Sequence, residues 1–208
     1  MNYETKKRLL DLLVAGGLLL IFLPFWIFIP ILIFFDSGLP IIFKHKRVGK
    51  NAKEFMILKF RSMVPNAHKI LHEENPELLE KFKNGDWKVK AEEDPRITPL
   101  GRFLRAFTID EFPQIFNVLK GDMSMVGPRA YMQEELDEQT KKYPHTKKLI
   151  PVILSVKPGV TGVWQTSGRN EIPFDQRAQL DADYAQHRSI WQDIQIILKT
   201  PKAMLSKW

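Results

Sequence analysis

An uninterrupted apolar run near the N-terminus constrains this chain more than any other feature. Residues 12–35 contain no charged side chain. As a helix this run would be about 36 Å long, enough to cross a hydrocarbon core of about 30 Å. The run is too long for a cleaved signal peptide, and it ends in Ile-Phe-Phe-Asp36, where a cleavage site would need small residues. We therefore expect a membrane segment that stays in the mature protein.

The flanks and the interior of the run leave its topology open between two arrangements. Basic residues stand on both sides of it: Lys6, Lys7 and Arg8 before, and Lys44, Lys46, Arg47, Lys50 and Lys53 after. Because basic flanks favour the cytoplasmic face, both ends prefer the same side of the membrane. Pro24 and Pro30 each remove a backbone donor, which predicts a kink near the centre of the run. The residues fit either a re-entrant hairpin or a proline-kinked spanning helix.

Composition limits what else the chain can hold. With 208 residues, 44% of them apolar, there is room for one domain with its own core beside the membrane segment. The net charge of +7 suits anionic lipid headgroups, a nucleotide diphosphate or nucleic acid, and the apolar run favours the membrane. There is no cysteine, which excludes disulfides, thiolate zinc sites and cysteine nucleophiles.

The chain beyond Asp36 has the composition of a globular domain. Apolar runs at 40–43 and 55–60 predict two strands joined by a turn at 49–51. Residues 66–93 are rich in Glu and Lys, with apolar residues at helical spacing. We expect this last segment to form a solvated, helical insertion.

Adjacent acids, Asp110 and Glu111, begin a predicted helix. Apolar residues at helical spacing continue to Leu119, and Thr108 with Glu111 three positions on matches a capping box. Across unrelated proteins, acids in a first turn mostly cap the helix and offset its dipole. That structural interpretation stands beside a catalytic one.

The surroundings of the acidic pair favour chemistry. Arg96, Arg102 and Arg105 lie just upstream, and a predicted strand at 123–126 would bring Arg129 back towards the helix start. A carboxylate among arginines stays ionised and therefore nucleophilic, and two adjacent acids can bind Mg²⁺ when substrate phosphates complete its shell. This arrangement suits phosphoryl transfer. Salt bridges between the same arginines and acids are the structural alternative.

Short motifs follow one another along nearly the whole chain. They are Lys7-Arg8 with Asp11, Arg47-Val-Gly49, Lys59-Phe-Arg61, Asp94-Pro-Arg96, Gly101-Arg102-Phe-Leu-Arg105, Asp110-Glu111 with Pro113-Gln114, Gly121-Asp-Met-Ser-Met-Val-Gly-Pro-Arg129, Lys157-Pro-Gly159 and Gly168-Arg169. On these motifs the sequence resembles the bacterial sugar transferases of the monotopic phosphoglycosyl transferase family. The resemblance implies an α/β fold, α+β and mostly helical, with amphipathic helices at the membrane interface. It also implies a re-entrant membrane helix in residues 1–36 and one membrane-associated catalytic domain in 37–208.

The resemblance further implies a two-step reaction. Asp110 would attack the β-phosphate of a UDP-sugar, release UMP and hold the phosphosugar as an acyl phosphate. Undecaprenyl phosphate would then accept the phosphosugar, with Glu111 as base or metal ligand, and with Mg²⁺ at Asp110 and Glu111 offsetting phosphate charge. The product, undecaprenyl-diphosphate-sugar, would begin assembly of an exopolysaccharide, O-antigen, capsule or glycoprotein glycan at the cytoplasmic face of the bacterial inner membrane.

Candidate substrate-binding residues follow from the same resemblance. Cations pair phosphate oxygens, and four are candidates for phosphate contacts: Lys59, Arg61, Arg105 and Arg129. Gln165 and Arg169 are candidates near the nucleotide or sugar. His45 stands where many relatives have Gln, and we assign it no role, because a lone histidine in a basic loop is usually a surface residue. Galactose or glucose is favoured over acetamido sugars, and the chain is expected to be the minimal catalytic form of the family.

Two other classes of function stay open. Asp181-Ala-Asp183 matches the Asp-x-Asp motif of metal-dependent glycosyltransferases, which release UDP, although it lies in a predicted helix without a Rossmann-like run ahead of it. A non-catalytic membrane adaptor would also fit the basic charge. Aromatic residues lie in apolar runs instead of a basic groove, so no nucleic-acid partner is expected. The expected partners are a UDP-sugar, undecaprenyl phosphate and membrane lipid, and a homodimer is left open.

The last apolar segment, residues 190–198, predicts an amphipathic helix. Followed by lysines, it would suit the headgroup layer of a membrane. The alternative is a core helix whose Trp191, Ile194 and Leu198 pack inward. The resemblance favours the interface.

Overall fold

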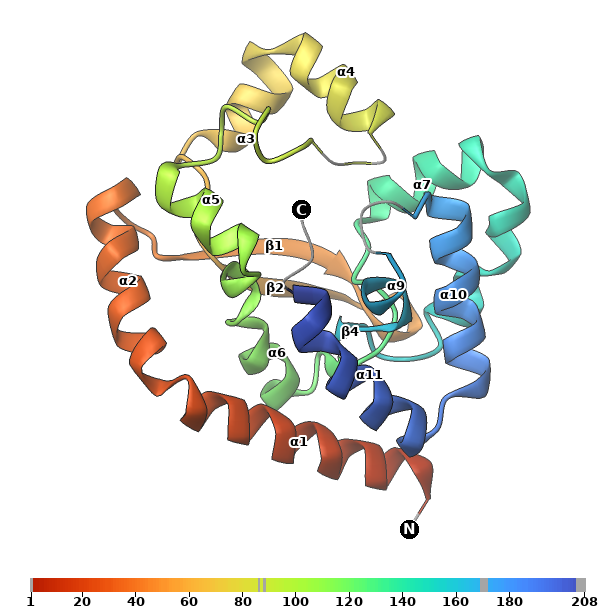
Figure 1. Cartoon of the computed structure of the whole chain (residues 1–208). Coiled ribbons are helices and arrows are strands. Elements are labelled where there is room, and N and C mark those ends of the chain that lie inside the picture. The colour runs from red at the N-terminus through yellow and green to blue at the C-terminus, as the bar shows by residue number, and fades with distance from the viewer. Residues whose placement is uncertain (1, 86, 88, 169–171, 205–208) are drawn as a thin grey trace.

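The computed structural model describes residues 2–85, 87, 89–168 and 172–204. Within these residues the fold is mostly helical α+β, as expected, with two small sheets (Figure 1). The helices are α1 (Tyr3–Ile21), α2 (Leu23–Ser37), α3 (Ala67–Lys69), α4 (Pro76–Asn84), α5 (Pro99–Ala106), α6 (Gln114–Lys120), α7 (Gln133–Lys142), α8 (Ile150–Ile153), α9 (Val163–Thr166), α10 (Phe174–His187) and α11 (Ile190–Met204). The strands are β1 (Ile42–Val48), β2 (Glu54–Phe60), β3 (Ser124–Val126) and β4 (Gly159–Thr161), and the short helical turns are η1 (Lys50–Ala52), η2 (Ile70–Glu74), η3 (Ile109–Glu111) and η4 (Pro144–Lys148).

The apolar run forms a bent pair of helices. α1 and α2 meet at 64°, and Phe22 between them leaves the helical range at φ −94° and ψ 19°. Pro24 stands in the first turn of α2, so the kink predicted near the centre of the run is confirmed. No single helix among the described residues has the length and apolar composition of a membrane span, whereas the bent pair has both together. The bend gives the pair a shape that a re-entrant loop can adopt.

Polar side chains fix α1 to the domain that follows. The Lys7 ammonium lies 3.2 Å from Asp11 and 3.3 Å from Asp193 of α11, and all three groups are buried. Asp11 also accepts a hydrogen bond from the Ser124 hydroxyl in β3, and Arg8 donates to two carbonyls at the end of α6. Buried charges persist only when paired in this way. α1 therefore runs along the base of the molecule beneath α6 and α11 as a part of the fold (Figure 1).

Helix α2 packs against the segment that carries the acidic pair. Ile29 and Ile33 of α2 are buried in one apolar cluster with Phe60 of β2, Leu104 of α5 and Ile109 of η3. Apolar burial on this scale stabilises by roughly 1.5–3 kcal/mol per side chain. The acidic pair is thus held directly beside the apolar helix.

A long antiparallel hairpin supports the same region. β1 and β2 pair from Ile42 opposite Phe60 to Val48 opposite Glu54. The first strand therefore begins later and ends later than the predicted 40–43, whereas the second agrees with the predicted 55–60. The turn between them lies where it was predicted, and Asn51 and Ala52 there have positive φ. Leu58 of β2 donates to the Asn117 side chain of α6, which ties the hairpin to that helix.

The second sheet is a short parallel pair, β3 with β4, and it confirms the strand predicted at 123–126. Two glycines allow the connecting segments to approach: a Cβ on Gly159 would lie 2.1 Å from the Gly127 nitrogen. β4 begins at the glycine of the Lys157-Pro-Gly159 motif, and the short helix α9 follows at once. The pair places Arg129, just after β3, next to α9 and α10.

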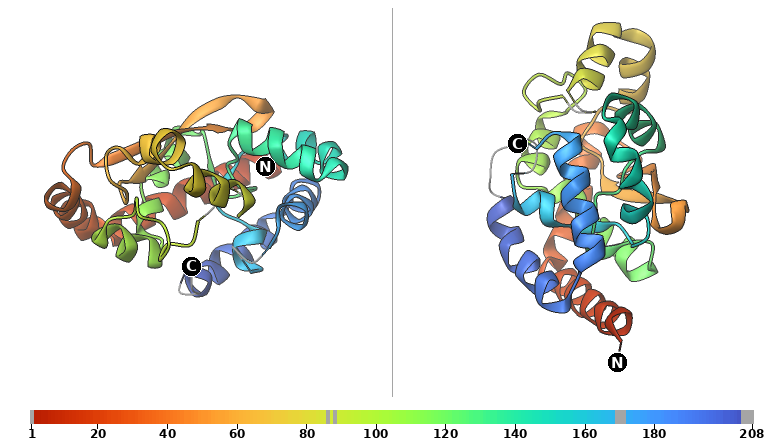
Figure 2. Two further views of the ribbon diagram at one scale, coloured as in Figure 1. Left: turned by 90° about the horizontal axis from the view of Figure 1, so that it is seen from above. Right: turned by 90° about the vertical axis from the view of Figure 1, so that its right-hand side faces the viewer.

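The acidic and basic stretch at 66–93 does form helices. α3, η2 and α4 stand at the end of the molecule opposite α1 (Figures 1 and 2). Asp94 and Arg96 close its base with a buried two-point ion pair at 2.7 and 2.8 Å. Lys83 of α4 reaches Glu138 of α7 at 2.9 Å, so the insertion is braced against a second element.

The C-terminal helix α11 contradicts the core-helix alternative. Trp191 is 68% exposed and Leu198 is 74% exposed, while Asp193 and Ile196 face the core. Inward packing of Trp191 and Leu198 is therefore wrong, because their positions lie on the face away from α1 and β3.

Candidate active site

The acidic pair lies on a tight reversal between two helices. The predicted helix from Thr108 to Leu119 is divided: α5 ends at Ala106, η3 spans Ile109–Glu111, and α6 begins only at Gln114. Thr108 adopts a left-handed conformation with φ 58°, and its side chain does not cap the turn, so the predicted capping box is wrong. A β-branched residue in this conformation is strained, and such strain gathers at functional sites.

Asp110 is buried by this reversal, with 2% of its surface exposed. Its Oδ1 atom has no hydrogen-bond partner among the described residues. Burial, followed by the charge of Glu111, raises the pKa of Asp110, while Lys59 and Arg105 oppose that rise. The prediction that nearby cations keep this carboxyl fully ionised is therefore incomplete: burial outweighs them, which leaves Asp110 more basic than an exposed aspartate.

Lys59 of β2 brings a cation to both acids. Its Nζ atom lies 2.6 Å from Glu111 Oε1 and 3.9 Å from Asp110 Oδ2. About a quarter of the Lys59 side chain is exposed, at 25%, so the group is open to a ligand. The three side chains form a compact catalytic candidate, and the contact of Lys59 with a substrate phosphate stays a prediction.

The upstream arginines have different partners. Arg105 of α5 donates a hydrogen bond to the Ser62 hydroxyl at 3.0 Å, and its positive charge lowers the pKa of Asp110. Arg61 donates to the carbonyls of Ser37 and Leu39, where α2 ends. Arg61 thus fixes the exit of the apolar helix, and its contact with phosphate stays a prediction.

A second charged cluster, which the sequence analysis missed, surrounds Glu135. Three guanidinium groups lie 3.7 to 3.9 Å from its carboxylate, from Arg47, Arg129 and Arg177. Arg129 and Arg177 both stack on Trp164, each 5.3 Å from a ring centroid. The cluster holds more positive than negative charge and leaves donor groups unused among the described residues, which suits an anionic ligand.

Arg129 belongs to this second cluster. Its backbone amide donates to Asp181, and its side chain lies by Glu135. Burial, followed by the charge of Arg129, lowers the pKa of Arg47 to about 10, while the charges of Glu135 and Glu111 oppose this fall. Arg47 is therefore close to both charged regions. The described contacts do not place Arg129 against the acidic pair itself.

The carboxylates of Asp181 and Asp183 do not form one site. Asp181 is buried, 1% exposed, and accepts from Tyr131 and from the Arg129 amide. Asp183 is exposed on the other side of α10 and accepts from Gln179. Residues two apart on a helix do not face each other. This arrangement speaks against an Asp-x-Asp metal site.

Gln165 and Arg169 stood as candidates near the nucleotide or sugar. Gln165 is on α9, next to Trp164, and its side-chain oxygen is buried without a hydrogen-bond partner among the described residues. That oxygen is available to a ligand. Arg169 lies outside the described residues.

A divalent cation fits the acidic pair only in part. Among the described residues, no group of three or more histidine, aspartate or glutamate side chains is placed to hold a metal ion. Asp110 and Glu111 offer two adjacent carboxylates, one with a free oxygen, and Mg²⁺ commonly takes one or two carboxylates and completes its shell with substrate phosphates. The residues therefore fit a cation that arrives with a phosphorylated substrate.

Comparison with known proteins gives a consistent result. A family model described as bacterial sugar transferase matches residues 2–207. The chain is 40% identical to the undecaprenyl-phosphate galactose phosphotransferase of Salmonella typhimurium, over 97% of this chain and 40% of that protein. It is 46% identical to the galactosyl transferase CpsE of Streptococcus agalactiae, over 98% of this chain and 43% of that protein. It is also 33% identical to the UDP-glucose:undecaprenyl-phosphate glucose-1-phosphate transferase of Caulobacter vibrioides, over 98% of this chain and 71% of that protein.

Proposed function

The chain belongs to the bacterial sugar transferase family, and on that premise we propose that it transfers a sugar-1-phosphate from a UDP-sugar to undecaprenyl phosphate. The products would be undecaprenyl-diphosphate-sugar and UMP, in the first membrane step of glycoconjugate assembly. Undecaprenyl phosphate is part of the names of the Salmonella and Caulobacter relatives, and the name of the Caulobacter protein also includes the donor UDP-glucose. The chain spans 40% of the length of the Salmonella relative. The proposal therefore rests on the site of this chain and not on the name of that protein alone.

The observation that carries the proposal is the buried Asp110 carboxyl beside Glu111 and Lys59. In the first step an Asp110 oxygen forms a bond to the β-phosphorus of the donor, and the bond to the UMP oxygen breaks. UMP leaves with the bonding electrons, and the phosphosugar remains on Asp110 as a mixed anhydride. Burial raises the pKa of Asp110, so its carboxylate is a stronger base and a stronger nucleophile once the proton is lost, and Lys59 and Arg105 favour that loss.

In the second step a phosphate oxygen of undecaprenyl phosphate attacks the phosphorus of this anhydride. The bond to Asp110 breaks, and the carboxylate is restored. In this step Glu111 would accept a proton from the incoming phosphate, and its place next to Asp110 in sequence and its partial exposure support that role. Splitting the transfer lets one small site serve two bulky substrates in turn.

The cations of the site stabilise charge during both steps. Lys59 lies against both carboxylates, and Arg105 acts on Asp110 from α5. Oriented cations of this kind contribute most of the rate enhancement in phosphoryl transfer. Mg²⁺ held by Asp110 and Glu111 together with the substrate phosphates would neutralise phosphate charge.

The position of α2 supports a re-entrant arrangement at the cytoplasmic face of the inner membrane. Basic residues flank both ends of the bent pair, and Arg61 bonds the backbone where α2 leaves the apolar layer. Large apolar side chains of α2 are exposed, among them Phe28 at 63% and Phe35 at 81%. Ile109, next to Asp110, packs in the cluster that includes α2, so a lipid phosphate would meet the nucleophile at the membrane surface.

The proposal is tested by the nucleotide that the enzyme releases. Detergent-solubilised protein is incubated with Mg²⁺, undecaprenyl phosphate and a panel of UDP-sugars, and UMP and UDP are separated by chromatography. We expect UMP, with release reduced about 10³-fold or more in Asp110→Asn. Asp183→Asn is the matched control, because this exposed aspartate is the second acid of the rival motif.

Each alternative predicts a different outcome in this experiment. Release of UDP, lost in Asp183→Asn, would establish the metal-dependent glycosyltransferase instead. Unchanged UMP release in Asp110→Asn would exclude the covalent mechanism. Without acceptor, mass spectrometry of the intact wild-type protein should show the added mass of one phosphosugar, absent in Asp110→Asn.

A further inference from the structure

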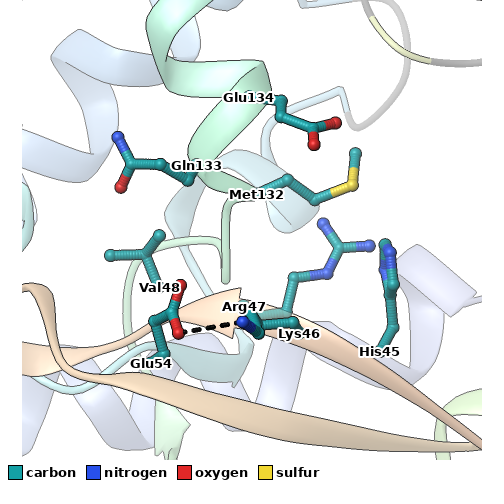
Figure 3. A pocket seen from close by; sticks show the side chains of 8 residues that line it. All are labelled: His45, Lys46, Arg47, Val48, Glu54, Met132, Gln133 and Glu134. Carbon is teal, nitrogen blue, oxygen red and sulfur yellow. Dashed lines mark ion pairs between the residues drawn. The ribbon is translucent and has the colours of Figure 1, made fainter.

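A cavity of about 240 Å³ lies between the hairpin and the start of α7 (Figure 3). Its lining residues are His45, Lys46, Arg47, Val48, Glu54, Met132, Gln133 and Glu134. The His45 ring and the Arg47 guanidinium rise side by side from β1 towards Met132 (Figure 3). The cavity is thus bounded by a histidine to which the sequence analysis assigned no role.

Two lining residues, His45 and Arg47, lie on the same face of the hairpin as Lys59, whereas the lining residues Lys46, Val48 and Glu54 belong to its other face. In the register of the strands, His45 stands opposite Ile57, and Phe43 opposite Lys59. Directly opposed residues share a face, as do alternate residues of one strand, so His45, Arg47 and Lys59 point to the same side. The charge of Lys59 lowers the pKa of His45, and the charge of Glu111 raises that of Arg47. Both effects agree with His45 and Arg47 lying near Lys59 and Glu111.

The size of the cavity matches only part of a nucleotide sugar. Pockets for drug-sized ligands commonly measure about 300–1,000 Å³, so 240 Å³ suits a single ring. The lining has no phenylalanine, tyrosine or tryptophan on which a uracil base would stack. The donor's β-phosphate, which Asp110 attacks, carries the sugar, and the sugar therefore lies nearest to the reacting atoms.

The polar groups of the lining suit hydroxyl groups. Glu134 supplies acceptors, Gln133 supplies both donor and acceptor, and Arg47 supplies donors. Burial, with the charges of Arg47 and Lys59, lowers the pKa of His45 to about 4. A neutral imidazole presents one donor and one acceptor, which can distinguish the orientations of a sugar hydroxyl.

The helical insertion lies near two residues of the cavity lining, His45 and Glu134. The charge of His68 lowers the pKa of His45, and the charge of Glu134 raises that of His72, so these pairs lie near one another. The ion pair of Lys83 with Glu138 holds α4 over α7. The insertion is therefore placed to limit the size of what the cavity receives.

We propose that this cavity seats the sugar ring of the donor and that His45 and Glu134 are specificity-determining residues that read its hydroxyl groups. The inference rests on the proposed transferase function and adds the site at which one sugar is chosen. A site that hydrogen-bonds a hydroxyl discriminates against a donor that presents it differently, because the half-buried His45 ring and the exposed Glu134 carboxylate at the rim then lose a partner. His45 and Glu134 act on choice of donor and take no part in bond breaking.

The test compares His45→Gln, Glu134→Gln and the control Lys141→Gln, which changes an exposed residue of α7. For each protein, kcat/KM for UMP release is measured with UDP-galactose, UDP-glucose and UDP-N-acetylgalactosamine. We expect the ratio between the best donor and the others to change about tenfold or more in both test variants and to stay constant in the control. A uniform change across donors, or none, overturns the inference.

A second measurement needs no turnover and separates the two proposals. The Tm of each protein is measured with UDP-galactose, UDP-glucose or UMP. The amount by which a UDP-sugar raises Tm more than UMP does reports contacts to the sugar. We expect that excess to fall in His45→Gln and Glu134→Gln while stabilisation by UMP persists. Equal excess in all proteins overturns the sugar site, and loss of UMP stabilisation would assign the cavity to uridine. Absent UMP release in wild type, with the excess intact, would refute the transferase reaction alone.

Discussion

Lys59 and Glu111 are joined across 2.6 Å, although 51 residues separate them in sequence and they come from β2 and η3. The same ammonium group lies 3.9 Å from Asp110, so one cation from the hairpin serves both acids. The hairpin, the reversal after α5 and the apolar helix α2 meet at this point. The proposed transfer reaction therefore depends on the register of a two-stranded sheet.

Replacement of Lys59 by Met should lower kcat for UMP release about 10²–10³-fold, because a cation aimed at the reacting phosphate is lost. The expected Tm changes little, since Met keeps the aliphatic stem and a quarter of the side chain is exposed, at 25%. Lys53→Met, at an exposed position in the turn of the same hairpin, is the matched control. Equal activity of the two variants would remove Lys59 from the site.

Magnesium should act on turnover and not on folding. We expect excess EDTA to abolish UMP release and added Mg²⁺ to restore it, because two carboxylates need substrate phosphates to complete the ion's shell. Mg²⁺ alone should leave Tm unchanged, and it should raise Tm only when a UDP-sugar is present. A clear rise with Mg²⁺ alone would indicate a site formed by the protein itself.

The sequence predicted those parts of the fold that depend on local chemistry. Pro24 stands at the start of α2, next to the break from α1, and the hairpin turn lies between the two predicted apolar runs. The reversal at Thr108 could not be predicted in this way, because apolar residues continue at helical spacing through it. Its strained conformation is imposed by the packing of α5 and α6 on their neighbours.

The same division holds for the site. Asp110, Glu111 and Lys59 carry recognisable chemistry and do meet in space. Glu135 was missed because the segment Gln-Glu-Glu-Leu-Asp-Glu in α7 has the composition of a solvated helix face. Only the packing of α7 against α10 buries this carboxylate beside Arg177, and no local pattern reports that contact.

Gly101 should tolerate no side chain. A Cβ there would lie 2.0 Å from the Ser62 carbonyl oxygen, so Gly101→Ala must push α5 away from the end of β2. We expect a loss of about 1–3 kcal/mol or more in the free energy of unfolding, together with lower activity, since Arg105 is on the displaced helix. Gly16→Ala is the control, because nothing lies within 4 Å of its added Cβ. Equal stability of both variants would mean that α5 is not held against Ser62.

Asp181 should give stability a characteristic dependence on pH. Burial raises its pKa from 3.8 to about 7, so the folded state holds this proton at a pH where the unfolded state has lost it. Its contribution to the free energy of unfolding is complete below pH 3.8 and is lost as pH rises to about 7. Asp181→Asn keeps an acceptor for the Arg129 amide and Tyr131 and should remove this slope. Thermal unfolding of both proteins at several pH values gives the difference, and parallel curves would contradict the raised pKa.

Trp191 should lie in the lipid headgroup layer. It is 68% exposed on α11, and Leu198 on the same helix is 74% exposed, which leaves an apolar surface that a membrane interface would cover. In vesicles that contain brominated lipids, we expect Trp191→Phe to reduce the quenchable part of the tryptophan fluorescence. Trp87→Phe is the control, because Trp87 is buried in the insertion, where its ring centroid lies 5.4 Å from that of Phe82. The quenchable part should persist in that variant, where Trp26 of α2 and Trp191 both remain. Quenching that is unchanged in Trp191→Phe would place α11 in water and leave contact with the membrane to α1 and α2.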